Sequence, residues 1–214
     1  MDLQTISTVI ASAGNYDLTT LTNVKAELSI TSSADDETLQ RYITSASKAI
    51  ANFCDRVFQV ETVKDEFWPV REDHSFQVSG GIETIQLSRW PVVSVATITE
   101  NSVDLTDGTD FRVNPKNGSL LRLNGVKYPV RWRSWPIAIT YDAGYAPIPS
   151  DVEDAAIRLV KARYVAKSRD PFLKQENIPG VREVTYWIAT GDDAANLPPD
   201  IADILDNYRV PVMA

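Results

Sequence analysis

The chain has 214 residues, of which 43% are hydrophobic, so it can bury one large core or two small ones. Its formal net charge of −8 argues against a surface that grips nucleic acid through phosphates. With one cysteine and one histidine, it has no internal disulfide, no multi-cysteine zinc site and no two-histidine metal site within one chain.

No apolar run approaches the roughly 20 residues that a membrane-spanning helix needs. Residues 1–5 lack the basic start and the apolar stretch of a signal peptide. We therefore expect a soluble protein that is made in the cytoplasm.

The first 57 residues predict a mobile arm followed by two helices. Residues 1–19 have no firm periodicity and are interpreted as the arm. Residues 21–28 place apolar side chains at helical spacing, and Thr20 or Thr22 can cap this short helix. A longer helix begins near residue 35, where acidic residues suit its positive end. One apolar stripe runs along it, formed by Leu39, Tyr42, Ile43, Ala46, Ile50, Phe53 and Cys54.

From about residue 57 to residue 145, short runs of β-branched and aromatic residues alternate with turn signals. Asp107-Gly108 and Asn117-Gly118 supply the positive φ angles that tight turns need. The predicted strands cover residues 82–87, 92–99, 111–113, 119–123 and 136–141. Because these strands are short and sequential, they favour an antiparallel sheet or partial barrel over a parallel α/β sheet.

Helical spacing returns near residue 150. Ser150 and Glu153 have the spacing of a capping box at the start of a helix that runs to about residue 167. The following segment, residues 170–196, is polar and irregular but contains large aromatic residues that need a surface to bury against. A final short helix is predicted over residues 199–208.

These elements predict an α+β fold. Neither long helix would be stable alone in water, because helical stability comes mostly from packing. We therefore expect residues 1–57 and 149–214 to form an α-helical bundle core, with an extended loop at residues 170–197 and a C-terminal tail. Residues 58–148 are then an inserted small antiparallel β-domain.

The sequence contains few of the reactive residues that most enzyme classes need. Phosphate-loop, dinucleotide-binding and nucleophile-elbow motifs do not occur in the sequence. His74 is interpreted as an exposed loop residue, and Cys54 as a buried thiol rather than a nucleophile. Asp104, Asp107 and Asp110 could offer oxygens to calcium, but they do not fit an EF-hand, and turn formation explains them better. We predict no catalytic residue, no metal and no cofactor.

Several short stretches, and the order in which they follow one another, resemble those of a known protein family. Arg-Trp-Pro-Val-Val-Ser-Val at residues 89–95 and Tyr-Asp-Ala-Gly-Tyr at residues 141–145 are the most specific. Others lie at residues 18–28, 43–58, 149–152, 169–171 and 205–211. Over about residues 18–210 the chain resembles the head–tail connector proteins, also called adaptor or head-completion proteins, of tailed bacteriophages and gene transfer particles.

This resemblance implies a non-enzymatic structural protein of the virion neck, made in the host cytoplasm. It implies a ring, a dodecamer in this family, that docks beneath the portal protein and lines the DNA exit channel. The expected partners are the portal protein, neighbouring copies of the chain, and the next neck, tail-completion or tail-terminator protein. DNA would pass without sequence-specific binding, and no membrane is involved.

We expect two sets of residues to carry this role. The portal or subunit interface is predicted to contain Phe172, Ile178, Tyr186, Trp187, Tyr208, Arg209 and Val210. The channel wall is predicted to contain Asp192, Asp193, Asp200 and Asp203, because an acidic wall repels DNA.

Three alternatives stay open from the sequence. The chain could be a neck or tail-completion protein of the next layer. Its β-rich part could be a carbohydrate- or host-binding module that uses Trp132 and Trp135, although packing in a sheet or an interface explains these residues more simply. Asp104, Asp107 and Asp110 could also serve a metal-dependent hydrolase.

Overall fold

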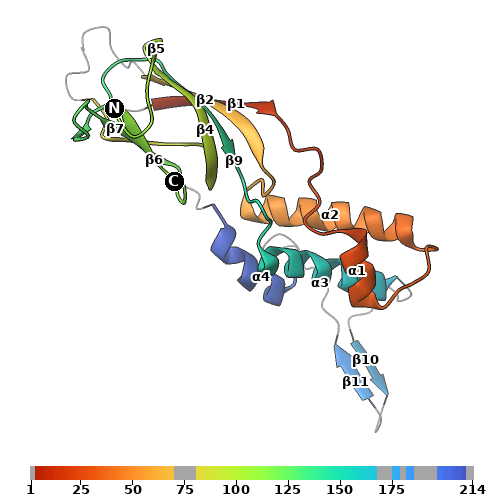
Figure 1. The fold of residues 1–214 in the computed structure, drawn as a ribbon. Helices are drawn as coiled ribbons and strands as arrows, with labels where there is room; N and C mark the ends of the chain where they lie inside the picture. Colours follow the sequence, from red (N-terminus) through yellow and green to blue (C-terminus); the bar gives the residue numbers. More distant parts are fainter. Residues whose placement is uncertain (1–2, 70–80, 168–174, 179–181, 186–196, 211–214) are drawn as a thin grey trace. The chain divides into compact units, whose positions relative to one another are not determined.

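The computed structural model describes residues 3–69, 81–167, 175–178, 182–185 and 197–210 (Figure 1). The chain divides into two compact units. The first unit comprises Met1–Gly14 and Gln59–Ala146, and the second comprises Asn15–Phe58 and Pro147–Ala214. No helix within the described ranges is long and apolar enough to span a membrane.

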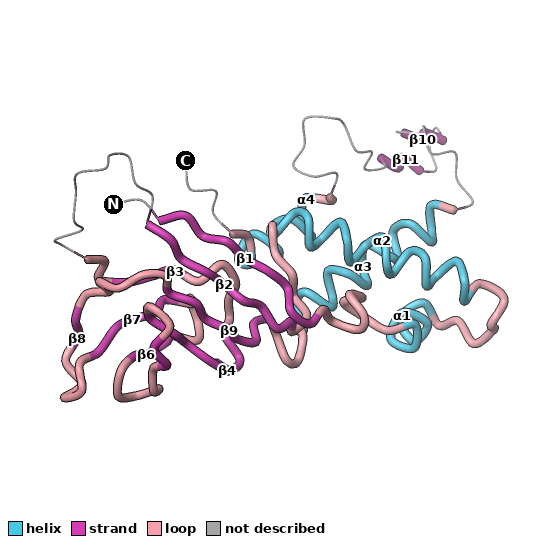
Figure 2. The backbone as a smooth tube through the Cα atoms, turned by 90° about the horizontal axis from the view of Figure 1, so that it is seen from above, coloured by secondary structure: helices cyan, strands magenta, loops and turns pink. Residues whose placement is uncertain are grey.

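The first unit contains two antiparallel sheets (Figure 2). The larger sheet has five strands in the order β1-β2-β9-β4-β5. Their bounds are β1 Leu3–Ala11, β2 Glu61–Pro69, β9 Ile137–Ala143, β4 Val92–Glu100 and β5 Val103–Asp104. In the smaller sheet, β7 lies between β3 and β6 and also pairs with β8. Its bounds are β3 Thr84–Gln86, β6 Phe111–Asn114, β7 Ser119–Leu123 and β8 Pro129–Val130.

The core of the first unit lies between the buried sides of these sheets. Along β2 and β9 every second residue is buried, which is the pattern of a strand with one side in a core. Both sheets contribute to one apolar cluster that includes Phe67, Ile85, Leu120, Trp132 and Ile139. Trp132 is fully buried and lies under the guanidinium of Arg122, so it is a core residue rather than an exposed stacking platform.

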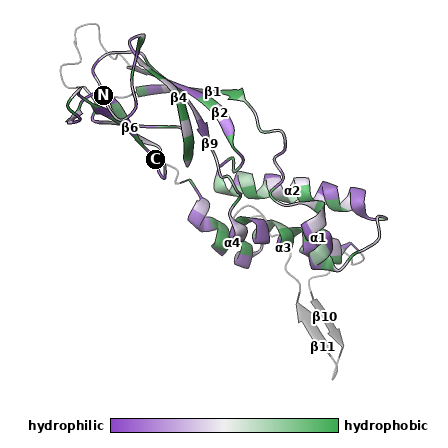
Figure 3. Cartoon of the chain, in the orientation of Figure 1, coloured by the Kyte–Doolittle hydropathy of each residue, from purple (hydrophilic) through white to green (hydrophobic). Residues whose placement is uncertain are grey.

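Four helices make up most of the described second unit. They are α1 Leu21–Leu28, α2 Asp36–Cys54, α3 Ser150–Ala166 and α4 Pro199–Leu205, with a 3₁₀ turn η2 at Asp206–Tyr208. α3 contacts each of the other three helices. Each helix carries both hydrophobic and hydrophilic residues, as expected when one side packs inward (Figure 3). A hairpin of β10 Gln175–Ile178 and β11 Arg182–Thr185 lies between α3 and α4 in the chain.

The predicted fold class, a helical bundle core with a small inserted β-domain, is wrong. Strands dominate the described residues, with a five-stranded and a four-stranded sheet beside only four helices, the longest of 19 residues. Residues 3–11 are not an arm but strand β1 of the larger sheet. The terminal segments therefore do not build one helical core.

The physical reason for this error lies in β1 and β2. β1 is exposed along nearly its whole length, so its sequence shows no apolar alternation. β2 does alternate in burial, but two of its buried positions hold Glu61 and Asp65, which hides the pattern from a hydrophobicity count.

The local predictions for the five strands and for the caps of α1 and α3 have different outcomes. The five strands predicted between residues 82 and 141 are confirmed, with ends shifted by at most two residues. Thr20 caps α1 by accepting a hydrogen bond from the Asn23 backbone N–H at 3.2 Å. The predicted capping box of α3 is wrong, because its N-cap is Pro149 and no side chain caps it. The Glu153 carboxylate instead accepts hydrogen bonds from Thr19 and Asn23.

Candidate functional site: interaction surfaces and a buried polar network

A polar network around the buried Asp65 and Tyr141 links β2, β9 and residues 88–89. The Tyr141 hydroxyl on β9 donates to the Asp65 carboxylate on β2 at 2.7 Å and accepts from the Arg89 backbone N–H at 3.1 Å. Ser88 donates to Asp65 from both its backbone N–H and its hydroxyl, at 2.8 and 2.7 Å. Burial, and then the neighbouring Asp65 charge, raise the pKa of Tyr141, so its hydroxyl stays protonated and remains a donor.

The same network joins the two most specific stretches of the sequence, residues 89–95 and 141–145. Arg89 forms an ion pair with the buried carboxylate of Glu61. Gly144 donates its backbone N–H to the Pro91 carbonyl at 2.9 Å. The φ of Gly144 is +139°, and a Cβ at this position would collide with the Gln59 carbonyl. Residues 89–91 and 141–144 thus hold the larger sheet together, which is a structural role.

Asp142, in the second of these stretches, joins three strands. It lies on β9 directly opposite Thr62 on β2 and Ser94 on β4. The Thr62 and Ser94 hydroxyls each donate to its carboxylate at 2.7 Å. These hydrogen bonds, that of Thr62 first, lower the pKa of Asp142.

The candidate nucleophile and the candidate metal ligand Asp110 lie in surroundings that suit a structural role rather than a reactive one. Cys54 is buried, as predicted, and burial raises its pKa to about 11, which leaves the thiol unreactive at neutral pH. Asp110 accepts a hydrogen bond from the Thr106 backbone N–H within a turn and lies 3.7 Å from Arg122. Among the described residues, no three His, Cys, Asp or Glu side chains gather as a metal site would require. His74 lies outside the described residues.

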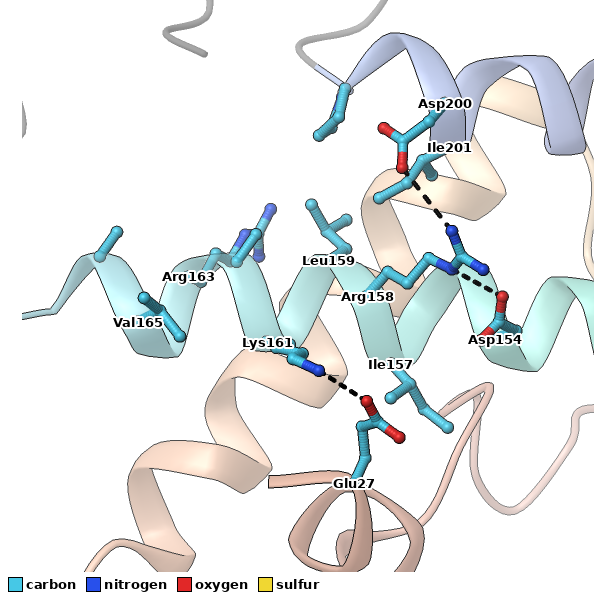
Figure 4. A pocket seen from close by; sticks show the side chains of 13 residues that line it. Glu27, Asp154, Ile157, Arg158, Leu159, Lys161, Arg163, Val165, Asp200 and Ile201 are labelled. Carbon is cyan, nitrogen blue, oxygen red and sulfur yellow. Dashed lines mark hydrogen bonds and ion pairs between the residues drawn. The ribbon is translucent and has the colours of Figure 1, made fainter. Parts of the chain in front are cut away.

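A groove runs along α3 in the second unit (Figure 4). Its volume is about 840 Å³, and α1 and α4 contribute to its walls. The apolar lining is Ile157, Leu159, Ala162, Val165, Ala166, Pro198 and Ile201. Val165 is 64% exposed, so apolar surface is open to solvent here.

Paired charges border this groove. Figure 4 shows Arg158 between two carboxylates, with Asp154 at 2.7 Å and Asp200 at 3.9 Å. Lys161 lies 2.7 Å from Glu27 of α1, and its hydrogen bond lowers the pKa of Glu27. An apolar lining with paired charges at its border suits contact with another protein segment and offers no free acid–base pair.

A smaller hollow of about 440 Å³ lies between α2 and the end of α3. Arg163 donates to Ser45 at 2.8 Å there. At the same end of α3, Lys167 and Tyr164 both donate to Asp35, at 2.8 Å each. The hydrogen bond from Lys167, followed by that from Tyr164, lowers the pKa of Asp35. These contacts fasten α3 to α2.

Of the predicted interface residues, three lie at the described end of the chain. The Tyr208 hydroxyl donates to Asp151 at 2.8 Å, and its ring lies 6.0 Å from that of Phe58. Arg209 stacks over Phe53 at 5.4 Å, and the Val210 backbone N–H donates to the Cys54 carbonyl at 2.9 Å. These contacts attach the chain end to α2 and α3.

The other predicted site residues divide into two groups. Asp200 and Asp203 lie on α4 with exposed side chains, and Asp200 also borders the α3 groove. The backbone of Ile178 is in β10, but its side chain is not described. Phe172, Tyr186, Trp187, Asp192 and Asp193 lie outside the described residues.

Sequence reasoning missed the α3 groove. A sign of it was present, because Ile157 and Val165 are apolar but lie off the buried stripe, with Lys161 midway between them. Apolar residues on the second side of a helix indicate a second contact surface.

Comparison with known proteins identifies the family. The model of the head completion protein family matches residues 17–210. The chain belongs to the head completion protein family. The resemblance read from the sequence is thereby confirmed, and a head completion protein is a structural component of a phage-type virion.

Two solved structures share the fold of this head completion protein. One is a chain from the neck of an empty gene transfer agent (GTA) particle computed with C6 symmetry, with a TM-score of 0.53 and 15% identity, covering 100% of this chain and 98% of that chain. The other is a chain from the virion of a native GTA particle, with a TM-score of 0.53, 12% identity and 98% coverage of both chains. The sequence matches no curated protein.

Proposed function

We propose that this head completion protein is a neck subunit that joins head to tail as part of a homo-oligomeric ring beneath the portal. The observation that carries the proposal is the family match over residues 17–210. The shared fold with a chain of a GTA neck supports the same location. The C6 symmetry used for that neck is compatible with twelve copies, and a dodecamer is the ring we propose.

We further infer that the protein acts without catalysis. The buried Asp65 and Tyr141 bond each other, and the most conspicuous charges around the α3 groove are paired. Such groups stabilise a structure and are poorly placed to activate a substrate.

In the proposed ring, the exposed acids Asp200 and Asp203 face the DNA channel together with Asp192 and Asp193. Negative charge along a channel reduces adhesion of DNA phosphates. Tyr208, Arg209 and Val210, with Phe172, Ile178, Tyr186 and Trp187, are proposed to contact the portal or neighbouring copies.

Electron microscopy of purified particles tests the location. We expect density for this chain as a closed ring in direct contact with the portal. Density elsewhere in the virion would contradict the proposal.

A binding experiment tests whether the chain occupies the neck layer next to the portal or the following layer. Purified protein should bind DNA-filled heads that carry a portal but no other neck protein. Binding only to heads that already carry another neck protein would assign the chain to the next layer.

A further inference from the structure

In the larger sheet, the edge strand β1 and the partly open strand β4 carry almost no charge. Eight of the nine residues of β1 are exposed, and none of the nine is Asp, Glu, Lys, Arg, Pro or Gly. β4 carries one charged residue, Glu100, at its last position. The inner strand β2 has four, namely Glu61, Lys64, Asp65 and Glu66.

The edge strand β1 lacks the residues that usually protect a sheet edge. Natural sheets protect their edges with lysine, proline or inward-pointing charges, because an open edge pairs with other chains. A nine-residue uncharged edge strand is therefore expected to have a partner in the assembled protein.

Both sides of β1 also carry uncovered apolar surface. Val9 lies opposite the buried Val63 yet is 41% exposed. On the other side, Ile6 is 44% exposed, and Trp68 of β2 nearby is 41% exposed. The last residues of β1 are drawn as hydrophobic in Figure 3. A partner that pairs with the free edge would also cover these side chains.

The opposite end of the same sheet is open as well. Within the described residues, β5 pairs with β4 only at Thr99 and Glu100. Leu105 donates to the Ile98 carbonyl and Val92 donates to the Pro115 carbonyl, which leaves residues 93–97, where the register shifts, without a strand on that side. Val93 in this part is 53% exposed. The sheet thus presents the uncharged edge of β1 at one end and a short uncharged open stretch of β4 near the other.

The strand directions make these two edges compatible. Each neighbouring pair in the series β1-β2-β9-β4 is antiparallel, so β1 and β4 run in opposite directions. If copies are related by rotation about an axis along the strands, the β1 of one copy meets the β4 of the next in antiparallel orientation. Such a contact joins different surfaces of the two copies and can close into a ring.

We propose that β1 of each copy pairs with the open edge of β4 in the neighbouring copy, so that the five-stranded sheets become continuous around the ring. This inference rests on the proposed ring. It identifies the strands that join neighbouring copies, which the family assignment does not.

Thiol cross-linking within assembled particles tests the pairing. The double variant Ile6→Cys/Val93→Cys should give a ladder of multimers with a short bis-maleimide reagent, while each single variant should give at most dimers. The native Cys54 can remain, because its thiol is buried and its pKa is about 11. Ile6→Cys/Val126→Cys is the matched control, since Val126 is 69% exposed in the same unit but lies in a turn.

A charge substitution gives a second measurement. Ile6→Lys should abolish incorporation into particles while the purified variant keeps the unfolding midpoint of the parent, since this side chain is already largely exposed. Val126→Lys should assemble normally.

The outcomes separate this inference from the proposed function. A ladder with the double variant supports the pairing. A ring seen by electron microscopy without a ladder overturns the pairing and leaves the ring intact. Cross-links from Ile6→Cys to a different neck protein also overturn it. Absence of any ring in particles of the parent protein overturns both.

Discussion

At the scale of single residues, the Tyr141 hydroxyl shows how the larger sheet is stabilised. It satisfies a carboxylate that is fully buried, and an unsatisfied buried charge would cost several kcal/mol. The apolar residues around this network could be recognised from their spacing, but the network itself could not. Asp65, Ser88 and Tyr141 are distant in sequence, and no spacing rule predicts that they meet.

Removing this hydroxyl should therefore be costly. Tyr141→Phe removes one of the donors to Asp65 and leaves the two from Ser88, and we expect a loss of about 1–3 kcal/mol in the free energy of unfolding. Urea denaturation measures it. Tyr128→Phe is the control, because Tyr128 is 69% exposed and its replacement should change stability little. An equal effect of the two substitutions would contradict the role assigned to Tyr141.

The hydrogen bonds to Asp142 predict that the free energy of unfolding depends on pH. Its pKa is lowered in the folded protein by the hydrogen bonds from Thr62 and Ser94, so the carboxylate stabilises the fold above the pKa of the unfolded chain. This contribution is lost as the pH falls through the folded pKa. An amide has one acceptor oxygen, so Asp142→Asn should cost roughly 1 kcal/mol at pH 7.

The measurement is the unfolding free energy from pH 7 down to pH 3. The difference between Asp142→Asn and the parent should shrink below about pH 4. Asp203→Asn, which changes an exposed carboxylate on α4, is the control. A difference that stays constant with pH would show that the loss comes from packing rather than from the charge.

At the scale of elements, helices were easier to predict than strands. The helix α1 begins and ends as predicted, because its apolar spacing and its Thr20 cap are local features. β1 and β2 pair across about fifty residues, and their stability comes from that pairing. Buried acids in β2 and the exposed residues of β1 left no local pattern to read.

The end of β9 provides a test at this scale. Gly144→Ala would place a methyl group against the Gln59 carbonyl at a φ of +139°, so we expect a loss of about 1–3 kcal/mol or more. The midpoint of urea unfolding should fall at unchanged slope. Gly125→Ala is the matched control, since no atom within 4 Å would meet its added carbon. A smaller loss at Gly144 than at Gly125 would contradict the argument.

At the scale of the whole molecule, the two units differ in what the sequence could reveal. The stretches at residues 89–95 and 141–145 carried the family resemblance, and the family match over residues 17–210 confirmed it. The α3 groove and the open edges of the larger sheet required coordinates, since exposure of an apolar residue depends on what packs against it. These surfaces, rather than any reactive group, are the parts of the molecule suited to an assembly function.

If Asp200 and Asp203 line the DNA channel, reversing their charge should slow DNA ejection. Asp200 and Asp203 are exposed on α4, and replacing both by lysine changes the local charge from negative to positive. Phosphates of passing DNA would then bind the wall, and the retention should weaken as salt screens it. Asp200→Lys/Asp203→Lys particles should eject DNA more slowly at low ionic strength than the parent, with recovery at high ionic strength. Glu83→Lys/Asp104→Lys makes the same charge change at exposed residues of the first unit and should leave ejection unchanged. Equal slowing by both variants would indicate an effect of net charge and would contradict a channel position for Asp200 and Asp203.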